Sequence, residues 1–152
     1  MHVGLLLYGD IDSQSGGYLY DRQLVSYLQR QGDRVEIISL PRRSYLHNLI
    51  SRDIPLELSG YQLDILIQDE LVYPRVFGIN PALKSRLNCP IVSLVHLLDS
   101  SRPQFWLRRL LADWAERRYL NSVEGLILNS RHTHQKVAEL LAGDIPPHVI
   151  AV

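Results

Sequence analysis

A pair of adjacent glycines and a single histidine are the residues of this sequence best placed to do chemistry. Gly16 and Gly17 follow the first predicted strand and precede the first predicted helix, and His96 follows the fourth predicted strand. Backbone N–H groups at the N-terminus of a helix suit an anion such as a phosphate group. An imidazole can donate or accept a hydrogen bond with a ligand held nearby. We therefore expect these three residues to form a ligand site, provided that the fold brings them together.

The elements that must position these residues alternate along the whole chain. Short apolar runs predict strands, and patterns with helical spacing lie between them. The predicted strands are 3–8, 34–40, 64–68, 90–95, 125–129 and 148–152. The predicted helices are 18–31, 81–87, 103–120 and 131–141, while 42–60 has no clear pattern. This alternation predicts an α/β fold, a Rossmann-like doubly wound parallel sheet.

The order of strands decides whether the glycines and the histidine meet. We expect the order 3-2-1-4-5-6, in which the first and fourth strands are neighbours and ligands bind in the crevice between their ends. The apolar run 91–95 belongs in the sheet, so His96 is the first polar side chain to emerge at its carboxyl end. The sequence therefore predicts that His96 faces this crevice beside Gly16 and Gly17.

Composition limits the class of protein. The chain has 152 residues, 46% of them hydrophobic and 21% charged, which suits one globular domain. Sixteen basic and sixteen acidic residues give a formal net charge of zero, which argues against a general nucleic-acid binder. No signal-like segment precedes the first strand, and no apolar run approaches the roughly 20 residues of a membrane span. We expect a cytoplasmic domain.

Several common motifs are missing from the sequence. It has no G-x-G-x-x-G dinucleotide fingerprint, no Walker-type phosphate loop and no G-x-S-x-G nucleophile elbow. His132 and His134 are two positions apart on a predicted helix, so they point to different sides and make poor zinc partners. Cys89 is the only cysteine, so no disulfide is expected, and we interpret it as a small buried apolar residue.

Other polar residues at strand ends have ordinary interpretations. Asp69 and Glu70 are interpreted as solvated loop residues. Asn129 and Ser130 are expected to cap the last helix, and Arg131 is expected at the surface.

The ordered set of elements resembles the N-terminal half of a GT-B glycosyltransferase, in particular the large retaining family 4. No single piece is specific, and the resemblance depends on their order and spacing along the whole chain. The matching pieces are Gly16-Gly17 with the helix 18–31, the strand 64–67, the segment 91–97, the helix end 115–120 with the strand 123–130, and the final segment 147–152.

The resemblance implies a division of roles between two domains. In such enzymes the N-terminal domain binds the acceptor, and the C-terminal domain binds most of the nucleotide-sugar donor; no metal or other cofactor is required. Gly16 and Gly17 match the loop near the donor diphosphate, and His96 matches the histidine near the transferred sugar, the expected catalytic residue. Residues 1–152 would be the acceptor-binding domain alone, without the C-terminal domain and therefore inactive in isolation. Glu116 and Glu124 have the eight-residue spacing of the family's glutamate pair, but we expect them in different places because one lies on a helix and the other beyond it.

Other functions stay open at this point. One alternative is a non-catalytic α/β binding domain for a small anionic ligand, and another is a self-contained small-molecule transferase. The expected partners of the glycosyltransferase are a nucleotide-sugar donor, a sugar or lipid-linked acceptor and its own C-terminal domain, with no nucleic acid. The segment 41–52 mixes basic and apolar residues. We interpret it first as an ordinary surface helix and second as a weak peripheral membrane contact.

Overall fold

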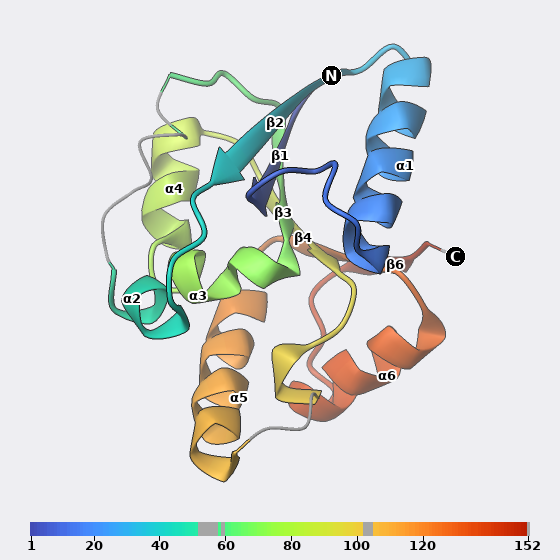
Figure 1. The fold of residues 1–152 in the computed structure, drawn as a ribbon. Coiled ribbons are helices and arrows are strands. Elements are labelled where there is room, and N and C mark those ends of the chain that lie inside the picture. Colours follow the sequence, from blue (N-terminus) through green and yellow to red (C-terminus); the bar gives the residue numbers. More distant parts are fainter. Residues whose placement is uncertain (52–57, 59, 102–104, 152) are drawn as a thin grey trace.

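The computed structural model describes residues 1–51, 58, 60–101 and 105–151. The first residues of the predicted helix 103–120, the last residue of the predicted strand 148–152 and part of the segment 42–60 lie outside the described residues. Six parallel strands form one sheet with helices on both sides (Figure 1). The predicted α/β class and the doubly wound parallel sheet are therefore confirmed.

The observed elements lie close to the predicted ones. The strands are β1 (His2–Tyr8), β2 (Arg34–Leu40), β3 (Ile65–Asp69), β4 (Ile91–Val95), β5 (Gly125–Leu128) and β6 (His148–Ile150). The helices are α1 (Gly16–Arg30), α2 (Tyr45–Ile50), α3 (Tyr73–Val76), α4 (Asn80–Leu87), α5 (Trp106–Leu120) and α6 (Arg131–Leu140), with 3-10 turns η2 (Glu70–Val72) and η3 (Asp99–Ser101).

The predicted strand order is wrong. The sheet runs β2-β1-β3-β4-β5-β6, so β3 lies between β1 and β4 and pairs with both. Burial explains this arrangement. Four of the five residues of β3 are buried, which requires cover on both faces, whereas β2 alternates between exposed and buried positions as an edge strand does.

Two apolar layers cover the sheet. On one face, Tyr18 and Val25 of α1 pack against Leu7 of β1, Ile67 of β3 and Leu94 of β4. The larger core lies with α3, α4, α5 and α6. Because α1 packs across three strands, its first turn reaches the end of β4 although β1 and β4 are not neighbours.

Candidate functional site

The two glycines form the first turn of α1. The helix begins at Gly16, two residues earlier than predicted, and the Ser15 side chain caps it by accepting the N–H of Tyr18 at 3.2 Å. The N–H groups of the first turn have no carbonyl partner within their own helix. Those of Gly16 and Gly17 therefore provide donors for an anion at the positive end of the helix dipole.

Gly17 and His96 lie side by side, which confirms the placement predicted from the sequence. A Cβ atom added to Gly17 would lie 3.3 Å from Cδ2 of His96, whereas one added to Gly16 would meet nothing within 4 Å. Neither glycine has a positive φ, so their backbone conformation does not require glycine. Glycine at position 17 is explained instead by the close approach of the imidazole.

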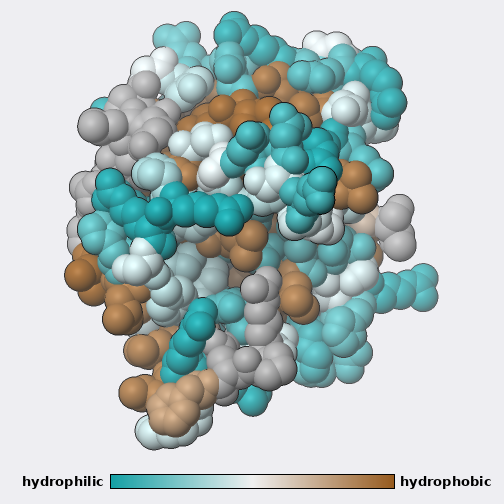
Figure 2. Space-filling model, in the orientation of Figure 1, coloured by the Kyte–Doolittle hydropathy of each residue, from teal (hydrophilic) through white to brown (hydrophobic). Residues whose placement is uncertain are grey.

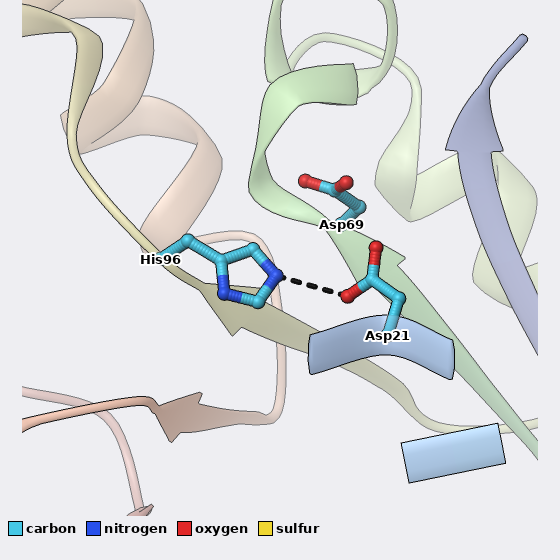
Figure 3. Close-up of side chains that lie close together, drawn as sticks. All are labelled: Asp21, Asp69 and His96. Atoms are coloured by element: carbon cyan, nitrogen blue, oxygen red, sulfur yellow. Dashed lines mark hydrogen bonds and ion pairs between the residues drawn. The ribbon is translucent and has the colours of Figure 1, made fainter. Parts of the chain in front are cut away.

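His96 is held in place on several sides. Its ring Nε2 lies 2.9 Å from Oδ1 of Asp21 on α1 (Figure 3). Its backbone N–H donates to the Glu70 carboxylate at 2.8 Å, and its backbone carbonyl accepts the hydroxyl of Thr133 at 3.1 Å. The Tyr20 ring packs edge-on, with 5.3 Å between ring centroids. The side chain of His96 is only 10% exposed, so most of its ring lies beneath the surface of the protein.

Two buried carboxylates accompany the imidazole. Asp21 and Asp69 are both inaccessible to solvent, and Figure 3 shows them coming from α1 and from the end of β3 beside His96. We call these three residues the Asp–His cluster. Burial, followed by the negative charge of Asp21, raises the pKa of Asp69 to about 6. One oxygen of each aspartate and Nδ1 of His96 are buried without a hydrogen-bond partner, so the Asp–His cluster has unused polar capacity.

The Asp–His cluster has the composition of a cation site. One ligand atom from each of the three residues lies within 4.8 Å of the others. However, the distance from Nε2 of His96 to Asp21 is that of a hydrogen bond, in which the imidazole N–H donates to the carboxylate. In this arrangement, a proton on the imidazole takes the place that a cation would need.

Some strand-end residues have roles other than those predicted. Asp69 and Glu70 were expected to be solvated loop residues, but both are buried. Asp69 belongs to the Asp–His cluster, and the Glu70 carboxylate accepts the backbone N–H of His96. Their burial follows from the strand order, because β3 is an inner strand and its carboxyl end adjoins that of β4.

The predicted helix cap is confirmed for one residue of the pair. Ser130 caps α6 by accepting the backbone N–H of Thr133, whereas the contact of Asn129 with this helix is to the Thr133 hydroxyl, 2.7 Å from its Oδ1. Arg131 is exposed and Cys89 is buried, as expected.

Glu116 and Glu124 contact different parts of the chain, as predicted from their positions. Glu116 accepts the backbone N–H groups of Asp99 and Ser100 in η3, at 2.5 and 3.3 Å. Glu124 accepts the N–H of Ile91 at 2.7 Å and pairs with Lys84. Burial raises the pKa of Glu116 to about 7. Both glutamates therefore stabilise the fold around β4.

Asp21 was missed at the level of sequence, although a signal for it exists. It lies three residues after Tyr18 and four before Val25, and these three side chains are the buried residues of α1. An acid within the apolar stripe of an amphipathic helix is unfavourable unless it has a partner. That position indicates that Asp21 has a buried partner, which in the structure is His96.

The fold and site define a Rossmann-like α/β domain with a helix N-terminus and a buried Asp–His pair at the carboxyl edge of its sheet. No protein-family model and no curated protein matched this chain. Among the described residues, no helix combines the length and the apolar character needed to cross a bilayer.

Proposed function

We propose that this chain is the N-terminal, acceptor-binding domain of a retaining glycosyltransferase that uses a nucleotide-sugar donor. The observation that carries the proposal is the contact between Gly17 in the first turn of α1 and the ring of His96 at the end of β4. It places N–H groups suited to an anion next to a hydrogen-bonding imidazole. The family resemblance of the sequence supports the same function.

The site residues have separate roles in this function. The bond from the sugar C1 to the donor diphosphate breaks, a bond from C1 to an acceptor oxygen forms on the same face, and the released diphosphate takes up the acceptor proton. The N–H groups of Gly16 and Gly17 and the α1 dipole stabilise the negative charge that develops on the diphosphate. Nδ1 of His96 accepts a hydrogen bond from a sugar hydroxyl, and Asp21 orients the ring. No step requires a metal.

The proposal requires a donor-binding domain in addition to residues 1–152. The test is to express the complete reading frame and to measure sugar transfer from a panel of nucleotide sugars to sugar and lipid-linked acceptors. We expect transfer by the complete protein and none by residues 1–152 alone. Transfer by the isolated chain would contradict the division between two domains.

The same experiment separates the catalytic proposal from a binding role. Pyrophosphate binding by the complete protein, without transfer from any donor in the panel, would instead support a non-catalytic domain for a small anionic ligand. The N–H groups of Gly16 and Gly17 favour this second candidate as much as the first, so turnover is the deciding measurement.

A further inference from the structure

A large exposed apolar surface lies away from the Asp–His cluster, on α2 and the first half of α5. Figure 2 shows hydrophobic side chains gathered over these elements at the lower left of the molecule. Six side chains, each between 49% and 74% exposed, define what we call the α2–α5 surface: Leu46, Ile50, Phe105, Trp106, Leu107 and Leu110. Contiguous apolar surface of this kind marks an interaction site more often than chance.

The two parts of the α2–α5 surface are adjoining. The guanidinium carbon of Arg108 on α5 lies 5.3 Å from the centroid of the Tyr45 ring on α2. The Tyr45 hydroxyl is in turn hydrogen-bonded to the Tyr73 hydroxyl on α3, at 3.0 Å. These contacts hold the two helices together, so their exposed apolar residues form one surface.

The first half of α5 projects from the body of the protein (Figure 1). Every residue from 106 to 111 is exposed. Consecutive residues of an α-helix are rotated by about 100°, so six in a row point in all directions around the axis. A helix lying on a flat protein partner would bury only one face, whereas a projecting apolar end suits a medium that surrounds it.

The charges on this surface are basic. Arg42 and Arg43 precede α2, and Arg108 and Arg109 lie on α5; all four are exposed. The segments 41–51 and 105–112 contain no acidic residue, although the whole chain is neutral. Asp99 lies 3.7 Å from Arg108, and Asp113 lines the same hollow as Arg109, so these acids balance part of that charge. Arg42 donates a hydrogen bond to the Tyr18 hydroxyl of α1. The remaining excess complements an anionic surface.

We propose that the α2–α5 surface docks on a membrane containing anionic lipid, with the apolar end of α5 inserted at the boundary between headgroups and acyl chains. Apolar and aromatic side chains would enter this boundary, while the arginines remain among the phosphates. Along the chain, α2 follows the carboxyl end of β2 and α5 follows that of β4, so the α2–α5 surface lies at the same edge of the sheet as His96. The docking is independent of the proposed sugar transfer.

Both tryptophans of the chain provide a probe. Trp106 and Trp114 lie on α5 and are 61% and 51% exposed. The chain is mixed with vesicles of phosphatidylcholine alone or with 30% phosphatidylglycerol, and bound protein is measured by co-sedimentation and tryptophan emission. We expect binding and a blue shift with the anionic vesicles, little binding to the neutral ones, and release at high salt.

Matched variants locate the contact. The double variant Leu107→Ser with Leu110→Ser removes apolar contact, and Arg43→Ala with Arg109→Ala removes charge. Each should weaken binding at least about tenfold. Their controls are Leu19→Ser with Tyr27→Ser on α1, and Arg30→Ala with Arg131→Ala, all at exposed positions elsewhere. Circular dichroism confirms that each variant is folded.

Several results would overturn the proposal. They are the absence of vesicle binding, equal binding to neutral vesicles, and equal loss in the control variants. Sedimentation velocity of the protein without vesicles tests a further alternative. A dimer that dissociates in the Leu107→Ser, Leu110→Ser variant would show that the surface instead contacts a second copy of the chain.

Discussion

Nε2 of His96 lies 2.9 Å from Oδ1 of Asp21, a fully buried residue located 75 positions earlier in the chain. A carboxylate that accepts one imidazole N–H holds the ring in a single orientation and tautomer. The other ring nitrogen, Nδ1, has no partner in the described structure. Asp21 thereby fixes Nδ1, which is buried, as the one ring nitrogen that the described residues do not engage.

We expect Asp21→Asn to lower the rate of sugar transfer by the complete protein more than it lowers stability. The amide keeps the size of the carboxylate but holds the imidazole less strongly, because a hydrogen bond to a charged acceptor is about twice as strong as a neutral one. A fall in kcat of roughly 10- to 100-fold, with little change in the donor KM, is the expected pattern. Steady-state kinetics and thermal unfolding measure the two effects.

Asp12→Asn is the control for this change, since Asp12 is exposed in the loop before α1. NMR of the His96 ring nitrogens gives a readout independent of activity, and the Asp21→Asn spectrum should show altered tautomers. Unchanged ring signals together with unchanged kcat would show that Asp21 does not orient the ring. His96→Ala is a less informative variant, because it would leave Asp21 buried and unpaired and so lower stability as well.

Substitutions of the two glycines should have different effects, although they are neighbours. Gly17→Ala places a Cβ 3.3 Å from Cδ2 of His96, and Gly16→Ala meets no atom within 4 Å. We expect Gly17→Ala to reduce kcat by displacing the ring, and Gly17→Val to reduce it further because valine is branched at Cβ. Gly16→Ala should leave thermal stability unchanged or slightly higher, since alanine favours helix. Equal kcat values for Gly16→Ala and Gly17→Ala would remove the argument from close approach.

Local patterns were enough to predict most of the fold. Each strand of the sheet was predicted within one or two residues in its described part, because buried parallel strands are short apolar runs between helical patterns. The predicted N-cap Ser130 is confirmed because capping depends on nearby residues alone. Gly32 and Gly143, which follow α1 and α6, both have the positive φ that glycine adopts easily at the end of a helix.

Contacts between distant elements could not be predicted in the same way. Strand order depends on which faces become covered, and the pattern of β3 alone does not show that it separates β1 from β4. The contact between Gly17 and His96 was predicted from the wrong strand order, and it exists because α1 packs across the sheet. The role of Asp69 was missed because its burial depends on the same packing, whereas Asp21 lies in the buried stripe of α1 and could have been predicted.

We expect Glu116→Ala to destabilise the chain by about 2–4 kcal/mol. The change leaves the N–H groups of Asp99 and Ser100 without their acceptor in a buried environment, at about 1–3 kcal/mol for each unsatisfied group. Glu116→Gln keeps one of the two acceptor oxygens and should cost less than the Ala variant, because the shorter bond from Asp99 can be retained. Glu139→Ala is the control, because Glu139 is exposed and its contacts with Lys136 and Gln135 on α6 are screened by solvent. Urea unfolding measures all three, and a similar loss for the Ala and Gln variants would contradict the assigned role.

The last prediction concerns the pH dependence of stability and follows from Asp69. Its pKa is raised from 3.8 to about 6 in the folded chain, first by burial and then by the charge of Asp21. The folded state therefore binds this proton more tightly than the unfolded state does. The stabilising contribution of this proton is fully present below about pH 4 and is lost as the pH rises through about 6; it amounts to about 3 kcal/mol in total.

Asp69→Asn cannot titrate, so the free energy of unfolding of the natural chain, relative to this variant, should fall over the same interval. Urea unfolding from pH 3.5 to 7.5 in the presence of a chelator tests this, and Glu116 titrates in both proteins and so cancels in the difference. A difference that stays constant with pH would show that Asp69 does not carry the proton.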